Sequence, residues 1–497
     1  MSPGEATMRR FGYRRAGGET CRAGLALKGG SVVAGLMVAG VPATVILAAG
    51  LWCVDASAVV AQSVAEARQD PPAEELTFEA AVALALEHNP GYQRQQNQMT
   101  ATQLSERQSF GQLLPSLSGG LSFSGNTSRV KTTEDEWGRP IAEADFIQST
   151  RSSTSQGLSG SMVLFDLGRI RRLGEARART ASQAAAVDLQ AALLRHQVGA
   201  DYYEAVLRSE LVAVEDRGLR TARDNLAAIR ELLRIAARQP TDVLGAELQV
   251  AQAEQSLQRA RGAARKASLQ LKSRIGVPLD REFALTSSFP EPFDPALLDR
   301  DAVLGRALVA SPRVAQQYAA TEAAERSLGV ARAAWYPSLS SSYSWGRSAS
   351  LPEYGAFRQW APENQSWGFS LSVSMPIFNR FQTTAGVGQA EVEAANAAQS
   401  LREVRLDLER EVRAALIDLE NAYTGVQLAE RSAEIAREQL RQGQEQYRLN
   451  TLDYTALQRM EDQVAAAERD VIQAYHSFVL ALLSLEEKVG EPVGVGG

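Results

Sequence analysis

The sequence consists of two related halves, and this internal duplication limits the possible folds more than any other feature. The segment Leu-Leu-Pro115-Ser-Leu-Ser returns as Trp-Tyr-Pro337-Ser-Leu-Ser. Each copy stands at the same distance behind an earlier proline, Pro90 or Pro312. Such self-similarity indicates that one supersecondary unit is used twice and that the copies pack on each other. The chain is therefore not expected to divide into unrelated globular domains.

The duplication also predicts the domain boundaries. We expect a first repeat at residues 76–278 and a second at 301–492, because the halves close with the matching turns Ile-Gly-Val-Pro and Val-Gly-Glu-Pro. Residues 279–300 lie between them and carry three prolines, which is typical of a linker. Residues 493–497 are left as a short tail.

Residues 1–61 have the pattern of an export signal peptide. Several arginines precede a long uncharged run, and small residues then offer cleavage after Ala58 or Ala61. A retained membrane anchor and lipid attachment at Cys53 are the alternatives. Residues 62–75 contain a Pro-Pro pair and mixed charges, which predict a flexible lead-in. Both cysteines precede residue 62, so the mature chain is expected to contain no thiol.

Each half is predicted to follow one order: helix, strand, polar loop, strand, long helix, last helix. The first helix is expected at residues 77–113 and its counterpart at 301–335, since each would end just before a proline. The long helices are expected at 168–237 and 384–449, and at 1.5 Å per residue they are rods of roughly 100 Å. The first and last helices of a half, laid end to end, match the long helix in length. A bundle of helical hairpins follows.

The helical segments carry apolar residues at steps of three and four, which is the pattern of coiled-coil contact, with one stutter of two successive fours in the segment that begins at Leu401. These seams comprise Leu219, Ala222, Leu226, Ile229, Leu233 and Ala236; Leu401, Val404, Leu408, Val412, Ala415, Leu419 and Ala422; and Val464, Ala467, Val471, Ala474, Phe478, Ala481 and Leu485. A solvated coiled-coil rod has the same pattern. The helices alone therefore leave that alternative open.

Four segments alternate between large apolar and small polar residues, which predicts β-strands with one apolar face. A soluble two-layer sheet has the same period. About ten residues of this alternation, with aromatic residues at the ends, is also what a tilted transmembrane strand needs. The residues expected to face lipid are Leu121, Phe123, Tyr343, Trp345, Trp367, Phe369, Leu371 and Val373.

The number of strands separates these two interpretations. Four strands cannot close a barrel, and an open sheet edge cannot be left in lipid, where each unpaired backbone group costs several kcal/mol. About eight strands is the minimum for a closed membrane barrel, so at least two chains must share one. The polar segments 126–156 and 347–366 are expected to be the loops at the outer surface.

With these motifs, the chain resembles the TolC-like outer-membrane efflux proteins. The resemblance spans residues 76–492 and includes Leu-Pro-Ser-Leu, Leu-Phe-Asp166 before the long helix, Thr-Asp242-Val after it, and the closing Gly-x-Pro. It implies a mainly α fold with membrane β structure: a homotrimer whose twelve strands form one barrel in the outer membrane of a Gram-negative cell, and whose helices form a coiled-coil α-barrel in the periplasm. The partners implied are a periplasmic adaptor and an inner-membrane transporter, either of the resistance-nodulation-division (RND) type or of the ATP-binding cassette (ABC) type.

The resemblance also implies a narrow aperture where the helical hairpins turn. The residues expected to form it are Asp242, Tyr447, Arg448, Asp453 and Arg459. Asp242 stands in the matching Thr-Asp-Val, and Tyr447 matches the tyrosine before the second turn. A first-turn carboxylate that stabilises a helix N-terminus is the alternative for Asp242. The second turn departs from the family pattern, which puts a gate of the usual composition there in doubt.

Charge and motif content exclude other classes of function. A formal net charge of −6 argues against nucleic-acid binding. The three histidines lie far apart, and neither a phosphate-binding lysine loop nor a dinucleotide fingerprint occurs, so no enzyme, metal or cofactor is expected. The function predicted is a passive exit duct for efflux or secretion, with a periplasmic adaptor or structural coiled coil as the alternative. The transported substrate is not predicted.

Overall fold

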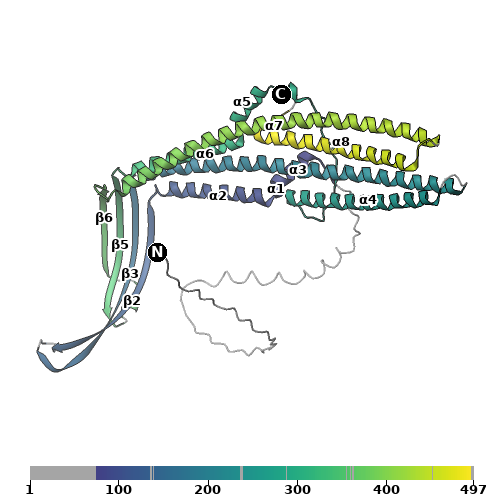
Figure 1. Ribbon diagram of the computed structural model, residues 1–497. Helices are drawn as coiled ribbons and strands as arrows, with labels where there is room; N and C mark the ends of the chain where they lie inside the picture. The colour runs from purple at the N-terminus through teal and green to yellow at the C-terminus, as the bar shows by residue number, and fades with distance from the viewer. Residues whose placement is uncertain are drawn as a thin grey trace, which may run out of the picture. The chain divides into compact units, whose positions relative to one another are not determined.

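The computed structural model describes residues 74–493, except for 135, 136, 138, 235–238, 287, 354, 359, 361, 362 and 450. The predicted signal peptide and nearly all of the lead-in lie outside the described residues. Two helix-strand-strand-helix-helix halves follow one another (Figure 1). The first comprises α1 (Phe78–His88), α2 (Pro90–Gly111), β2 (Ser116–Glu134), β3 (Pro140–Asp166), α3 (Leu167–Arg234) and α4 (Pro240–Ile275). The second comprises α5 (Arg300–Ala310), α6 (Pro312–Ala333), β5 (Ser338–Pro352), β6 (Asn364–Ser374), α7 (Gln382–Arg448) and α8 (Tyr454–Val489).

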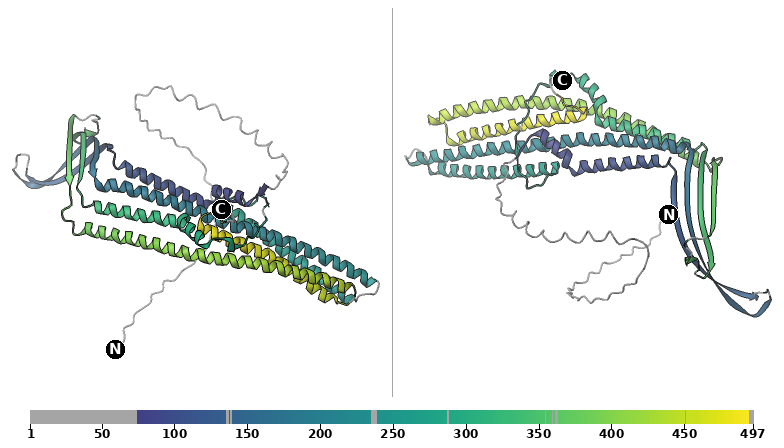
Figure 2. Two further views of the ribbon diagram at one scale, coloured as in Figure 1. Left: turned by 90° about the horizontal axis from the view of Figure 1, so that it is seen from above. Right: turned by 180° about the vertical axis from the view of Figure 1, so that it is seen from behind.

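The long helices α3 and α7 form the axis of each half, as the sequence predicts. In the first half, α2 and α4 pack along successive stretches of α3; in the second, α6 and α8 do the same along α7 (Figure 2). The halves pack together because α3 also contacts α6 and α8. Among the described residues, no helix has both the length and the apolar character required to cross a bilayer.

The first helix of each half is broken, which corrects the continuous helices expected at 77–113 and 301–335. The residue before each interior proline leaves the helical region, because the proline ring clashes with its backbone. Asn89 and Ser311 both adopt ψ near 120° at these breaks. The Asn89 side chain accepts hydrogen bonds from the backbone N–H groups of Gly91 and Tyr92 at 2.8 and 3.0 Å, so it caps α2.

A glycine turn lies against each break. Gly276 ends α4 with φ 87°, and Gly490 ends α8 with φ 84°, a left-handed conformation that only glycine adopts at little cost. A Cβ at Gly276 would collide with the carbonyl of His88, and one at Gly490 would lie 2.8 Å from the carbonyl oxygen of Ala310. The repeated Gly-x-Pro motif is thus the point at which the last helix of each half closes on the first.

One large apolar cluster joins the two halves at mid-length. It combines Tyr202 of α3, Leu419 of α7 and Phe478 of α8, all fully buried. The Tyr202 hydroxyl donates a 2.9 Å hydrogen bond to the carbonyl of Leu76 in β1 (Glu74–Leu76), which pairs in parallel with β4 (Phe283–Leu285). Two short 3₁₀ helices, η1 (Pro295–Leu297) and η2 (Gly355–Arg358), complete the described elements.

The predicted coiled-coil seams are buried where the helices meet. Leu219, Ala222 and Ile229 on α3 are at most 6% exposed, and Leu408, Val412 and Leu419 on α7 are at most 1% exposed. Alanine recurs in these seams, which permits close approach of the helix backbones. The alternation of three and four therefore predicts the packing faces correctly.

Candidate functional site

The four long strands form one antiparallel sheet in the order β2-β3-β5-β6. The strands are longer than the sequence pattern suggests, because pairing continues into the segments expected to be loops. Asn126 pairs with Arg151 and Arg347 with Gln365, for example. Polar side chains do not interrupt a ladder that is held by backbone hydrogen bonds. Within the described chain, β2 and β6 each have one partner strand, so each leaves one edge open.

All eight residues predicted to face lipid lie on a single face of this sheet. The register places Trp345 opposite Trp367 and Tyr343 opposite Phe369, and paired residues in an antiparallel ladder share a face. Side chains on this face are solvent-exposed in the single chain: Trp367 is 76% and Val373 is 73% exposed. We name this surface, built on these eight residues, the apolar face.

A β-bulge explains the one strand whose alternation is irregular. The register of β3 against β5 shifts between Val163 and Phe165, so that Phe165 pairs with Leu339. An extra residue in one strand reverses which face the following side chains occupy. Phe165 therefore joins the apolar face, although strict alternation from Ser161 would place it on the other side.

The opposite face is lined with serine. Hydroxyls pair across the strands as Ser116–Ser161, Ser118–Ser159, Ser122–Ser155, Ser124–Ser153 and Ser342–Ser370, with oxygen-oxygen distances of 2.7 to 2.8 Å. We name it the serine face. Each hydroxyl can both donate and accept a hydrogen bond, so this face is compatible with water.

The apolar face ends at a polar row farther from the helices. Arg347 lies beside Gln156 in the ladder, and its guanidinium carbon stands 5.2 Å from the centre of the Trp345 ring. Beyond this row, η2 packs against the sheet, and the backbone N–H of Ala356 donates to the Ser152 hydroxyl at 3.1 Å. Aromatic residues followed by polar ones mark the edge of an apolar band.

At the other end of the helices, two of the predicted aperture residues cap helices within their own hairpins. The Asp242 carboxylate accepts from the backbone N–H of Gln239 at 3.3 Å and completes a capping box on α4. Asp453 caps α8 by accepting from the backbone N–H of Ala456 and the hydroxyl of Thr455, both at 2.9 Å. These hydrogen bonds, with a smaller contribution from Arg459, lower the pKa of Asp453 below its usual value.

The predicted arginines also make contacts within their own helices. Arg448 pairs with Glu445 at 3.4 Å, and the Arg459 side chain donates to the carbonyl of Thr455 at 3.2 Å. Tyr447, in contrast, packs with Tyr454 in an apolar cluster that includes Ile229 and Ala246 of the first hairpin. Of the five predicted residues, Tyr447 is therefore the one for which the structure gives a contact between the two hairpins.

Polar contacts between the hairpins lie farther from the turns, at residues that the sequence did not single out. The Asn225 amide of α3 donates to both oxygens of Glu461 on α8, at 3.1 and 2.9 Å. Arg469 of α8 pairs with Glu215 of α3 at 2.8 Å. Burial raises the pKa of Glu461, and the hydrogen bond from Asn225 partly opposes this shift. Charged residues are common on helices, so no sequence signal distinguishes these pairs.

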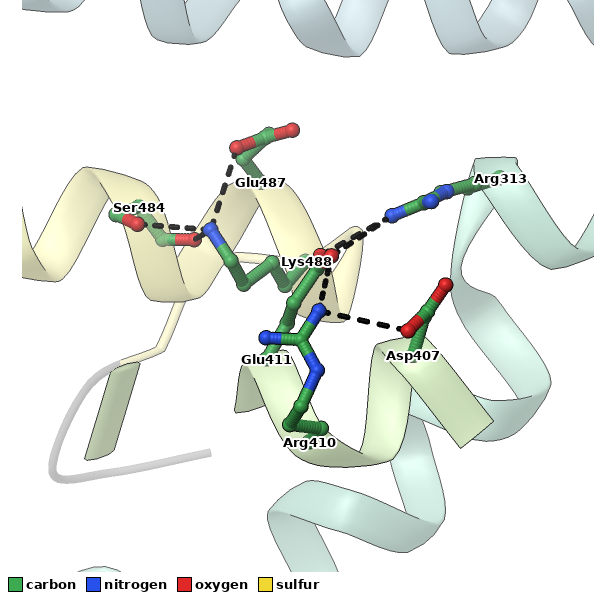
Figure 3. Close-up of polar contacts among 7 residues, drawn as sticks. All are labelled: Arg313, Asp407, Arg410, Glu411, Ser484, Glu487 and Lys488. Atoms are coloured by element: carbon green, nitrogen blue, oxygen red, sulfur yellow. Dashed lines mark hydrogen bonds and ion pairs between the residues drawn. The ribbon is translucent and has the colours of Figure 1, made fainter. Parts of the chain in front are cut away.

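Many titratable groups of the described chain form ion pairs within and between helices. In the junction drawn in Figure 3, Arg313 of α6 binds Glu411 of α7 at 3.1 Å, and Lys488 of α8 contacts the Ser484 hydroxyl at 2.8 Å. His476 lies 3.4 Å from Glu204, and burial lowers the pKa of His476. No group of three potential ligands that could hold a metal is found in the described part of the chain.

Comparison with known proteins agrees with this geometry. Residues 303–491 match the family model described as outer membrane efflux protein. No curated protein matches the chain. Among solved structures, the CmeC outer membrane channel of Campylobacter jejuni has 15% sequence identity and a TM-score of 0.66, over 83% of this chain and 85% of that one.

Two further channels give similar values. The open state of the MtrE outer membrane channel of Neisseria gonorrhoeae has 18% identity and a TM-score of 0.64, over 84% of this chain and 89% of that one. The outer membrane protein VceC of Vibrio cholerae has 16% identity and a TM-score of 0.63, over 83% and 96%. These identities establish a shared fold, and the family model matches within the second half of the chain. The chain therefore has the fold of these outer membrane channels, and its residues 303–491 are similar to the outer membrane efflux protein family.

Proposed function

We propose that this chain is one subunit of a passive exit duct, in which three copies close a twelve-stranded barrel in the outer membrane and their helices enclose a tunnel in the periplasm. The observation that carries the proposal is the sheet of four strands, open at both edges, with an exposed apolar face and a serine face. The family match supports the location and a role in transport.

The open edges give the physical reason for an assembly of several copies. Unpaired N–H and C=O groups on β2 and β6 each cost several kcal/mol in lipid, and pairing β2 of one copy with β6 of the next removes that cost. The apolar face then turns toward lipid with its eight predicted residues. The serine face turns toward water in the lumen. A soluble adaptor or a coiled-coil rod would leave this apolar face exposed to water.

The duct needs a partner that supplies energy, since the sequence contains no nucleotide-binding motif. We propose that an adaptor in the periplasm links the hairpin ends to an inner-membrane pump of the RND or ABC type. Asp242, Tyr447, Arg448, Asp453 and Arg459 stand at these ends and are proposed to line the aperture. Asp242 and Asp453 cap helix N-termini within one chain. They would narrow the aperture where these hairpin ends of neighbouring copies face one another.

A pair of adjacent substitutions tests the barrel. Leu371→Arg places a charge on the apolar face of β6, whereas Ser370→Arg places the same charge on the serine face one residue away. In a barrel, an arginine facing the bilayer midplane costs about 2–4 kcal/mol, and one facing the lumen costs far less. We expect Leu371→Arg to reduce the amount of trimer in detergent-solubilised outer membranes at least tenfold and Ser370→Arg to leave it nearly unchanged.

Planar bilayers provide the second measurement. The wild type and Ser370→Arg should give discrete single-channel conductance. A soluble periplasmic monomer without conductance, or equal tolerance of the two substitutions, would contradict the barrel and favour the adaptor alternative.

A further inference from the structure

We propose that a ring of Arg151 side chains at the outer end of the barrel forms a binding site for multivalent oxyanions. This inference rests on the proposed function, because the ring exists only if three copies turn their serine faces inward. Arg151 lies on that face: it pairs with Asn126 of β2 on one side and with Pro352, the last residue of β5, on the other. It therefore stands in the outermost row that three strands of the sheet share.

Between Arg151 and the end next to the helices, the serine face is neutral. From Ser153 to Ser161 on β3, and along the facing residues of β2, β5 and β6, it carries serine, glycine and asparagine. At the end next to the helices, Asp166 caps α3 through the backbone N–H of Arg169 at 3.1 Å, and its carboxylate lies 3.6 Å from the Arg169 side chain. Over the stretch from Ser153 to Ser161, a neutral hydroxyl lining thus separates the charge of Arg151 from that of Asp166.

Arg151 has no ion pair within the described residues, and its side chain is exposed. The nearest rows of its own face supply no carboxylate: its ladder neighbours two residues away are Ser124, Ser153 and Ser350. Arg347, by contrast, lies on the opposite face and stacks on Trp345. Arg151 and Arg347 thus lie on opposite faces of the same sheet, and Arg347 pairs with Gln156, five residues along β3 from Arg151.

A barrel of twelve strands is narrow enough for three Arg151 side chains to act on an ion at the pore axis. Twelve strands spaced about 4.8 Å apart and tilted by about 40° enclose a diameter of about 24 Å. An arginine that reaches inward brings its guanidinium to within about 10 Å of the pore axis, which is the Debye length at 0.1 M salt. Three guanidinium groups converging on one opening favour an anion with several oxygens, because each group donates in a planar fork.

Channel block in planar bilayers tests the ring, with inorganic tripolyphosphate as the probe. Added on the barrel side in 0.1 M KCl, tripolyphosphate should reduce the wild-type current. Arg151→Gln should weaken this block at least tenfold, and Arg151→Lys should retain most of it. Raising KCl to 1 M shortens the Debye length to about 3 Å and should abolish the block.

Arg347→Gln is the matched control, since it removes one positive charge from the lipid side of the same sheet and should leave the block intact. Equal block of the wild type and Arg151→Gln would overturn the inference, and so would loss of block in Arg347→Gln alone. A wild-type protein that forms no channel would instead overturn the proposed function.

Discussion

The two halves of the chain are closely alike where the helices meet and differ where the strands turn. In both halves a proline breaks the first helix, and a left-handed glycine closes the last helix on that break. The strand hairpins differ: β2 and β3 have 19 and 27 residues, whereas β5 and β6 have 15 and 11 and are joined through η2. Packing constrains the proline breaks and glycine turns of the helices, whereas the ends of the strand hairpins differ between the halves.

The capping of the two breaks also differs in detail. Asn89 caps α2 and in addition donates from its amide to the carbonyl of Arg274 at 2.7 Å, which ties the start of α2 to the end of α4. Ser311 stands at the equivalent place and makes no side-chain capping bond. The second half therefore relies on the glycine turn and apolar packing, whereas the first half has an additional polar connection.

The largest effect is expected from alanine at the glycine turns. Gly276→Ala imposes left-handed strain and a collision with the His88 carbonyl, so we expect a loss of about 2–4 kcal/mol. Gly490→Ala should follow with a smaller loss, because its nearest contact is longer. Thermal unfolding followed by circular dichroism measures both.

Gly262→Ala is the control for these substitutions. Gly262 lies within α4, and nothing stands within 4 Å of its Cβ position, so alanine should stabilise the helix by up to about 1 kcal/mol. Equal destabilisation by all three substitutions would show that the left-handed conformation and the close contacts at Gly276 and Gly490 do not matter for stability.

A medium effect should separate Asn89 and Ser311, the two residues that precede the interior prolines. Asn89→Ala removes two capping bonds and the link to Arg274, at a cost of about 1–2 kcal/mol, whereas Ser311→Ala should change stability by less than about 0.5 kcal/mol. The same unfolding measurement applies. Equal losses at the two sites would remove the distinction drawn between the halves.

The smallest effect concerns the contact between the hairpins. Burial raises the folded-state pKa of Glu461, so the folded chain binds that proton more tightly, and stability should fall as pH rises above the ordinary glutamate value of 4.5. Glu461→Gln retains an acceptor for Asn225 but carries no charge. It should remove this pH dependence and change stability by less than about 1 kcal/mol at neutral pH.

Unfolding temperatures measured at pH values above 4.5 test the prediction. An unchanged profile in Glu461→Gln would mean that Glu461 is not the group responsible.

The fold class predicted from the sequence is confirmed, and residues 303–491 match the model of the outer membrane efflux protein family, in agreement with the predicted resemblance. The boundaries of the two repeats and the composition of the aperture remain predictions. In the structure, Asp242 and Asp453 act as helix caps and Arg448 pairs within its own helix.

The sequence by itself determined the features that depend on local pattern. Helical seams, strand alternation, proline breaks and the duplication all follow from residues a few positions apart, and both faces of the sheet follow from the two-residue period of a strand. Only the tertiary structure decided which distant residues meet. The bulge at Val163 depends on the register against β5, the Asn225–Glu461 contact joins residues 236 positions apart, and Arg151 reaches the outermost row through pairing with two other strands. Register is a property of two strands together, so one segment read alone cannot specify it.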